Sequence, residues 1–225
     1  MKALSLPDYT TRLLLLAAIL ALVLGGLLAF LVPTDVLQGP LTRILYLHVP
    51  VAWVAYLSFG VAAGYALAHL LTRQAKFDRI SAASAELGVI FTSLTLITGM
   101  LWGRPAWGAY WVWEPRLTTT AILLAIYLGY FALRQTVPDR EVRGVVSGAV
   151  AILGLIGVPI SYMSVYWWRG LHQTASIDLV NQQVHLAPPM LAALLINLLA
   201  FSLIYLAFLR ARSRLAELEE KWESS

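Results

Sequence analysis

The sequence is dominated by long apolar runs, and the first of them, residues 13–32, contains no charged residue. A helix needs roughly 20 apolar residues to cross about 30 Å of hydrocarbon at about 1.5 Å per residue. The apolar core of a secretory signal peptide is shorter, at roughly 7 to 15 residues. The run therefore predicts an uncleaved first transmembrane helix.

Five further apolar segments follow, separated by short polar breaks, and they predict transmembrane helices near residues 44–70, 84–102, 117–134, 144–166 and 186–209. Hydrophobic residues make up 60% of the chain and charged residues 12%, far from the composition of an average soluble protein. We therefore expect an all-α polytopic membrane protein, a bundle of six transmembrane helices forming one domain over residues 1–225. Residues 210–225 alternate in charge at helical spacing and predict a cytoplasmic helical extension.

The basic residues are distributed unevenly over the two predicted sides of the membrane. Twelve of the 16 lysines and arginines fall on the side of the termini, and the other side keeps Arg43, Arg104, Arg116 and Arg169. The positive-inside rule then places both termini in the cytoplasm. Because the basic residues are scattered through short loops, we expect no nucleic-acid partner. The chain has no cysteine, which excludes disulfides and thiolate metal sites.

Tryptophan is concentrated on the predicted outer side, in a loop over residues 102–117 and again near the fifth span. Six of the eight tryptophans lie at positions 102, 107, 111, 113, 167 and 168, whereas an interfacial anchoring belt would use both membrane faces. Trp107 and Trp111 are four residues apart, so we expect a short amphipathic helix on the membrane surface that stops at Pro115. The spacing alone fits an aromatic binding platform and ordinary interfacial anchoring equally well.

Two histidines, His48 and His172, fall on the same predicted side as the tryptophans. Two opposed imidazoles can occupy both axial positions of a haem iron, indole faces can stack on the porphyrin, and arginines can bind its propionates. Each histidine alone would also fit an ordinary interfacial polar residue, and each arginine a side chain that reaches toward lipid headgroups. His69 is predicted to be structural, and His185 is a reserve ligand candidate.

Three sequence motifs resemble the tryptophan-rich signature and its flanks in the haem-handling proteins of cytochrome c maturation. They are WGAYWVWEPRLTT preceded by TGMLWGRP, YLHVPVAW, and SVYWWRGLHQ. Over nearly its whole length the chain is similar to CcmC, the haem exporter protein C family. The related families CcmF and CcsA are larger or carry additional histidine pairs.

The resemblance implies that haem is held at the outer face by His48 and His172 as axial ligands to the metal, beside the tryptophan-rich loop. Mapped onto this chain, the loop residues are Trp107, Gly108, Trp111, Trp113, Glu114, Arg116 and Leu117. The family usually has aspartate at the position of Glu114, so the resemblance predicts a carboxylate there rather than one fixed geometry. The haem propionates are expected near Arg43, Arg104 or Arg116.

The resemblance also implies that haem b is a transient cargo and that the chain is a binding and delivery protein of the cytoplasmic (inner) membrane, not an enzyme. Its functional face would point toward the periplasm, and membrane lipid would surround it. The implied partners are the haem chaperone CcmE and the CcmA, CcmB and CcmD membrane complex.

Two other classes of function remain open from the residues. A transporter that moves haem or another solute through the bundle would place ionisable residues at mid-membrane depth, but the spans hold few, and Glu86 lies near the predicted cytoplasmic end. An enzyme, either a haem lyase in its own right or a quinone oxidoreductase, is the second class. Positioning of haem could by itself promote covalent attachment, and no internal histidine pair suited to electron transfer is evident.

Overall fold

The computed structural model describes residues 8–168 and 170–223. Within these residues, six helical stretches are long and apolar enough to cross a membrane, which confirms the predicted all-α membrane fold. The helices are α1 (Tyr9–Leu31), η1 (Pro40–Ile44), α2 (Leu45–Thr72), α3 (Ala75–Trp107), α4 (Pro115–Thr136), α5 (Arg140–Gly154), α6 (Gly157–Trp167) and α7 (Pro188–Glu223). A two-residue hairpin of β1 (Ile177–Asp178) and β2 (Gln183–Val184) precedes α7.

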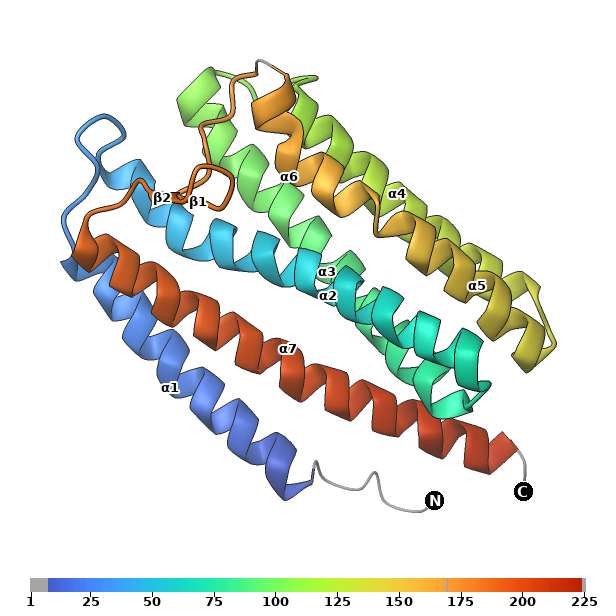
Figure 1. The fold of residues 1–225 in the computed structure, drawn as a ribbon. Coiled ribbons are helices and arrows are strands. Elements are labelled where there is room, and N and C mark those ends of the chain that lie inside the picture. Colours follow the sequence, from blue (N-terminus) through green and yellow to red (C-terminus); the bar gives the residue numbers. More distant parts are fainter. Residues whose placement is uncertain (1–7, 169, 224–225) are drawn as a thin grey trace.

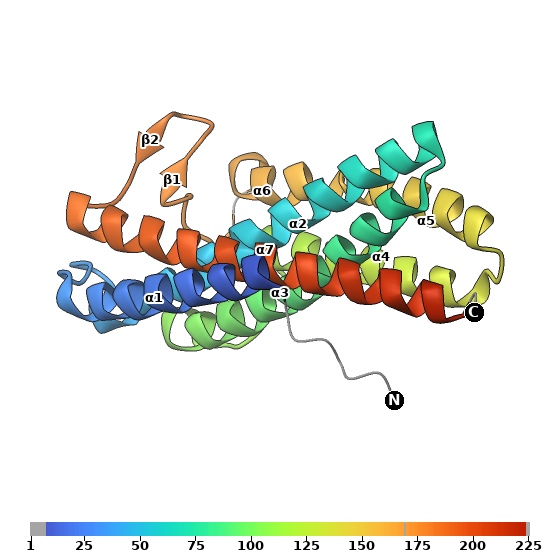
Figure 2. The same cartoon turned by 90° about the horizontal axis from the view of Figure 1, so that it is seen from below.

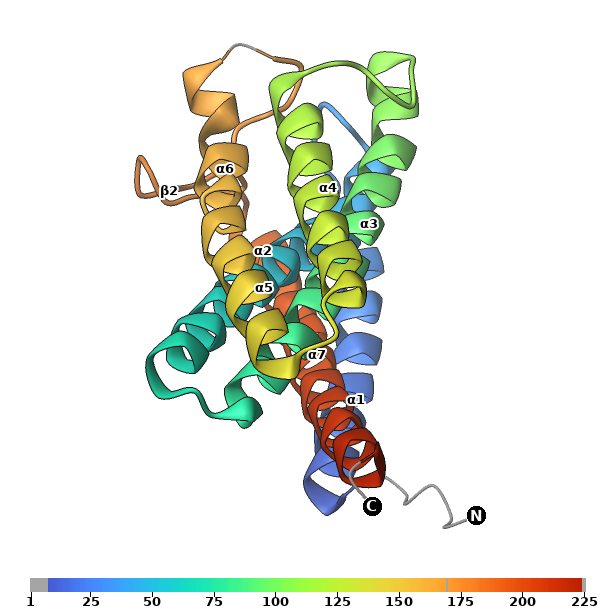
Figure 3. The ribbon, with the colours of Figure 1, turned by 90° about the vertical axis from the view of Figure 1, so that its right-hand side faces the viewer.

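The helices pack as antiparallel neighbours (Figures 1 and 2). α1 lies along α7 and α2 lies along α3, and these are the two most extensive helix pairs. α4 pairs with α5 and α6 on the far side of α2 and α3, as Figure 3 shows. The core between these layers is aromatic, since Phe59 of α2 stacks on Tyr127 of α4 with ring centroids 3.8 Å apart.

The fifth membrane-spanning segment is divided into α5 and α6 at residues 155 and 156. Pro159 has no N–H to donate to the carbonyl of Leu155, and its ring crowds that carbonyl, so the helix breaks there. The break lies against α4, where a Cβ at Gly157 would come within 2.9 Å of Leu123.

The bundle has two chemically different ends (Figure 1). The first, which we call the aromatic end, carries the loops 32–39, 108–114, 168 and 170–187. The second, which we call the basic end, carries both described chain ends and the turns at 73–74 and 137–139. Tyr9 and Glu223, the outermost described helical residues of α1 and α7, both lie toward the basic end.

The short surface helix expected from the spacing of Trp107 and Trp111 does not form. Instead, α3 continues to Trp107 and is capped by Gly108, whose φ of 81° is left-handed and whose N–H donates to the carbonyl of Arg104 at 3.0 Å. Residues 108–114 have no helical structure. Trp111 and Trp113 therefore pack edge to face across an irregular loop, with centroids 5.3 Å apart.

The helix α3 begins at Ala75, nine residues before the apolar segment predicted from the sequence. The additional turns contain Asp78, whose carboxylate accepts two hydrogen bonds from Arg134 of α4 at 2.7 and 2.9 Å. Pairing between helices lets charged residues lie inside the bundle. Hydropathy along the chain therefore places the start of this helix too late.

Candidate functional site

A pocket opens at the aromatic end, between the outer turns of α2, α3 and α4 and the loop that follows α6. The pocket and the open solvent at its mouth together hold about 1110 Å³ of space outside the protein atoms. Its lining residues include His48, Ala52 and Trp53 of α2, Thr95, Gly99, Trp102 and Trp107 of α3, Arg116 and Thr120 of α4, Tyr162 of α6, and His172 of the loop. Both candidate ligand histidines therefore line one cavity.

His48 lies in the first turn of α2 and is half-buried. Its Nδ1 is 2.9 Å from the hydroxyl of Thr98 on α3. When that hydroxyl donates its own proton to the carbonyl of Leu94 at 2.7 Å, it accepts from Nδ1 of His48. In that arrangement Nδ1 of the neutral imidazole carries the proton and Nε2 carries the lone pair.

The space around His48 is set by α3. A Cβ at Gly99 would lie 3.2 Å from Cε1 of His48, closer than an ordinary contact, so glycine lets the ring lie close to α3. Trp102, one turn further along α3, meets the imidazole edge to face with centroids 5.6 Å apart. The ring is thus fixed by the hydroxyl of Thr98 and by the indole of Trp102.

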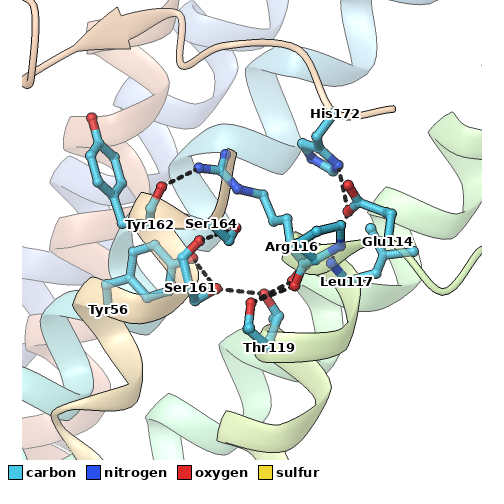
Figure 4. Close-up of polar contacts among 11 residues, drawn as sticks. Tyr56, Glu114, Arg116, Leu117, Thr119, Ser161, Tyr162, Ser164 and His172 are labelled. Atoms are coloured by element: carbon cyan, nitrogen blue, oxygen red, sulfur yellow. Dashed lines mark hydrogen bonds and ion pairs between the residues drawn. The ribbon is translucent and has the colours of Figure 1, made fainter. Parts of the chain in front are cut away.

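His172 is oriented by a carboxylate instead of a hydroxyl. Its Nδ1 lies 3.0 Å from Oε1 of Glu114, the residue that caps the N-terminus of α4, and Figure 4 shows the ring pointing toward that carboxylate. The same oxygen accepts the backbone N–H of Leu117 at 2.8 Å. An ionised carboxylate only accepts hydrogen bonds, so His172 donates from Nδ1, and in the neutral imidazole Nε2 then carries the lone pair.

The charge state of Glu114 supports this assignment. The side chain is buried, with only 6% of the residue exposed, and burial raises the pKa of its carboxyl. The hydrogen bonds from His172 and from the amide of Leu117, together with the nearby guanidinium of Arg116, outweigh burial, so the pKa of Glu114 lies below its ordinary value. The carboxylate is therefore ionised at neutral pH.

Arg116 is held between α4 and α6, where its Nη2 donates to the carbonyl of Tyr162 at 2.8 Å (Figure 4). Its Nε is buried and has no hydrogen-bond partner among the described residues, and the same is true of Oε2 of Glu114. Trp107 packs against His172 with ring centroids 5.4 Å apart. The pocket thus combines two imidazole lone pairs, indole walls and a cation with an N–H donor still available, a set suited to an iron porphyrin.

A hydroxyl cluster lies below Arg116 and ties α2, α4 and α6 together. The hydroxyl of Ser161 is 2.9 Å from that of Tyr56 and 2.9 Å from that of Thr120. Tyr56 and Thr120 also line the pocket. These bonds fix the relative positions of the three helices that carry His48, Arg116 and the loop to His172.

The profile of the haem exporter protein C family matches residues 2–225, almost the full chain. The chain belongs to the haem exporter protein C family.

Curated members of the haem exporter protein C family are similar over most of their length. The protein of that name from Haemophilus influenzae is 39% identical over 213 residues, covering 91% of this chain and 85% of its own. The one from Bradyrhizobium diazoefficiens is 37% identical, covering 88% and 75% respectively. The one from Escherichia coli is 35% identical, covering 92% and 84%.

Several residues predicted to contact haem do not line the pocket. Trp113 is 83% exposed, and Trp111 is half-buried, with no hydrogen-bond partner for its Nε1 within residues 8–168 and 170–223. Arg43 lies over the ring of Phe30 at 5.0 Å. Arg104 donates to the carbonyl of Gly108 at 2.9 Å.

Of the predicted propionate partners, only Arg116 lines the cavity. Arg43 packs on α1 through the ring of Phe30, and Arg104 donates to the loop at Gly108. Arg169 lies outside the described residues. The remaining histidines are also elsewhere: His69 is buried at the basic end, and His185 lies 3.9 Å from Asp178 beside the hairpin.

The residues that sequence reasoning missed are Thr98, Trp53 and, as a wall of the pocket, Trp102. The signal for α3 is present in the sequence, because Thr95, Gly99, Trp102 and Ala106 recur at the three- and four-residue spacing of one helix face. Reading that spacing backward from Trp107 would have found the face. Trp53 carries a comparable signal, since it lies on the α2 face that presents Val49 and Tyr56 to the same cavity.

Proposed function

We propose that this chain binds haem in the pocket at the aromatic end, with Nε2 of His48 and Nε2 of His172 as axial ligands, and delivers it for cytochrome c maturation. The observation that carries the proposal is the pair of Nδ1 hydrogen bonds. Thr98 and Glu114 each occupy Nδ1 and leave Nε2 as the lone-pair nitrogen in a shared cavity. Neutral imidazole oriented by a bond at its other nitrogen is the usual form of a metal-binding histidine.

The remaining walls support a flat, apolar cargo with acidic substituents. Trp102 and Trp107 supply indole surface on the α3 side, and Trp53 supplies it on the α2 side. Arg116, with its Nε unpartnered, would bind a propionate by a charge-assisted hydrogen bond. We assign the propionate contact to Arg116 rather than to Arg43 or Arg104 because only Arg116 lines the cavity.

Orientation and partners complete the proposal. The excess of basic residues at the end that holds both described chain ends supports a cytoplasmic basic end. The aromatic end would then face the periplasm from the inner membrane. There the chain would present haem b, as transient cargo, to the haem chaperone CcmE, with CcmA, CcmB and CcmD assisting release. In this role its residues position haem and catalyse no reaction of their own.

The test is haem loading of purified variants in which the histidines are replaced. We expect His48→Ala and His172→Ala each to lower haem content, and the double variant to lose stoichiometric haem, measured by the Soret band and the pyridine haemochrome. His185→Ala is the matched control, since this histidine lies at the same end but does not line the pocket. The control should load as the unaltered protein does.

Two results would overturn the proposal. Unchanged haem content in the double variant would remove both histidines as ligands. Uptake of haem into the lumen of vesicles that contain this chain alone would favour transport through the bundle over loading at the outer surface.

A further inference from the structure

A second cavity lies at the basic end, between α3, the α4–α5 turn and the last turns of α7. It encloses about 1000 Å³ of space outside the protein atoms, open solvent included. Five arginines and four carboxylates line it: Arg79, Arg134, Arg140, Arg143, Arg212, Asp78, Glu86, Glu219 and Glu220. None of these residues takes part in the haem pocket.

The four carboxylates are all paired by three of the arginines. Arg134 binds Asp78 through two hydrogen bonds, and Arg79 donates to Glu220 at 2.7 Å. Arg212 donates to Glu86 at 2.8 Å and lies 3.6 Å from Glu219. Arg143, which also lines the cavity, takes no part in these pairs.

Within the described part of the chain, the guanidinium of Arg143 has an unsatisfied hydrogen-bond donor. Arg143 is half-buried, its Nε is buried, and among the described residues that Nε meets no hydrogen-bond acceptor. No ion pair involving its guanidinium is formed within residues 8–168 and 170–223. A buried guanidinium N–H without an acceptor is costly, and an anionic oxygen would satisfy it.

The position of the cavity indicates where that anion comes from. α4 and α7 each pack on α3 but make little contact with each other, so α3 forms the floor of a cleft between them. Phe131 and Ala83 line the cleft on the side of the membrane interior, and Arg140 lines it near the turn. An ionic end and an apolar end side by side match a phospholipid, and basic pockets between transmembrane helices bind lipid headgroups.

We propose that this cavity is a binding site for the phosphate group of an anionic phospholipid, with Arg143 as the principal contact and the acyl chain passing Phe131. The bound lipid would join the C-terminal turns of α7 to the α4–α5 turn. The site is independent of the haem pocket, which lies at the opposite end of the bundle.

The experiment titrates the detergent-purified full chain with short-chain phosphatidylglycerol and measures binding by native mass spectrometry and the shift in thermal unfolding. Arg143→Gln should bind roughly tenfold more weakly, the loss expected for one charge-assisted contact. Arg143→Lys, which keeps the charge without the Nε donor, should bind with intermediate affinity. Arg73→Gln is the matched control, because Arg73 is an exposed arginine of the same end and pairs at 3.6 Å with the exposed Glu141.

Circular dichroism of each variant confirms that the helices are intact before binding is compared. Equal affinity of Arg143→Gln and Arg73→Gln would overturn the proposal. Inorganic phosphate alone stabilising the protein as strongly as phosphatidylglycerol would replace the lipid site with a free-anion site, and equal binding of phosphatidylcholine would remove the requirement for net negative charge.

Discussion

Replacing Thr98 by valine should weaken haem binding without touching either proposed ligand. Valine has nearly the shape of threonine but cannot accept the proton of Nδ1 of His48, which now lies 2.9 Å from the hydroxyl. In the variant, the imidazole can move its proton to Nε2, the nitrogen that we assign to iron. Binding must then displace that proton or leave Nδ1–H unpaired.

The size of the effect follows from the surroundings of this hydrogen bond. A typical hydrogen bond contributes about 0.5–1.5 kcal/mol, and a buried donor left without an acceptor costs about 1–3 kcal/mol. His48 is half-buried and faces the pocket, so water can replace part of what is lost. We expect a loss of about 1–2 kcal/mol, or roughly 5- to 30-fold in affinity.

The assay is a haem titration of the apo-protein in detergent, followed by the Soret band. Thr95→Val is the matched control, because Thr95 lines the same pocket on the same helix but donates only to the carbonyl of Phe91 at 2.8 Å. Thr98→Ser keeps the hydroxyl and should restore affinity. If Thr98→Val and Thr95→Val bind haem as tightly as the unaltered protein does, the tautomer argument is refuted.

Three further predictions concern the site and the bundle. Glu114→Gln should make the stability of the protein less sensitive to acid. Because the pKa of Glu114 is lowered in the folded state, its stabilising contribution is complete above the ordinary glutamic acid pKa and is lost as the pH falls through the folded-state pKa. The unfolding temperature of the variant should therefore change less with pH in the acid range. Gly144→Ala would place a methyl group 2.5 Å from Nε2 of the buried His69 and should destabilise the bundle by about 1–3 kcal/mol in thermal unfolding. Gly129→Ala is the control, because a methyl group there would meet open space and should not destabilise the bundle. Trp107→Ala should lower haem affinity roughly tenfold and the exposed Trp113→Ala much less, and the opposite order in a haem titration would contradict the pocket assignment.

The positions of the membrane helices were largely predictable from the sequence. A backbone within hydrocarbon must satisfy its hydrogen bonds internally, so apolar runs of sufficient length have few alternatives to the helix. The predictions failed where side chains from different helices neutralise each other. The start of α3 was placed late because Asp78 is polar in sequence but is paired with Arg134 in space.

The residue types of the candidate site were also predictable from the sequence, but which of these residues line the pocket was not. The residue types that suit haem, namely histidine, tryptophan and arginine, were all found near the predicted outer side. The expected surface helix would have placed Trp111 on the same face as Trp107. The left-handed cap at Gly108 ends α3 instead, so Trp107 joins the pocket and Trp111 turns away from it.

Local order along the chain determined six apolar helices, the asymmetry of basic residues and the presence of two imidazoles among tryptophans, since each of these depends only on neighbours in sequence. Tertiary structure alone decided which group lies at Nδ1 of each histidine. The partners at Nδ1 are Thr98, supplied to His48 by another helix, and Glu114, supplied to His172 by the start of α4. Contacts of this kind arise from helix packing, and no spacing within a single segment encodes them.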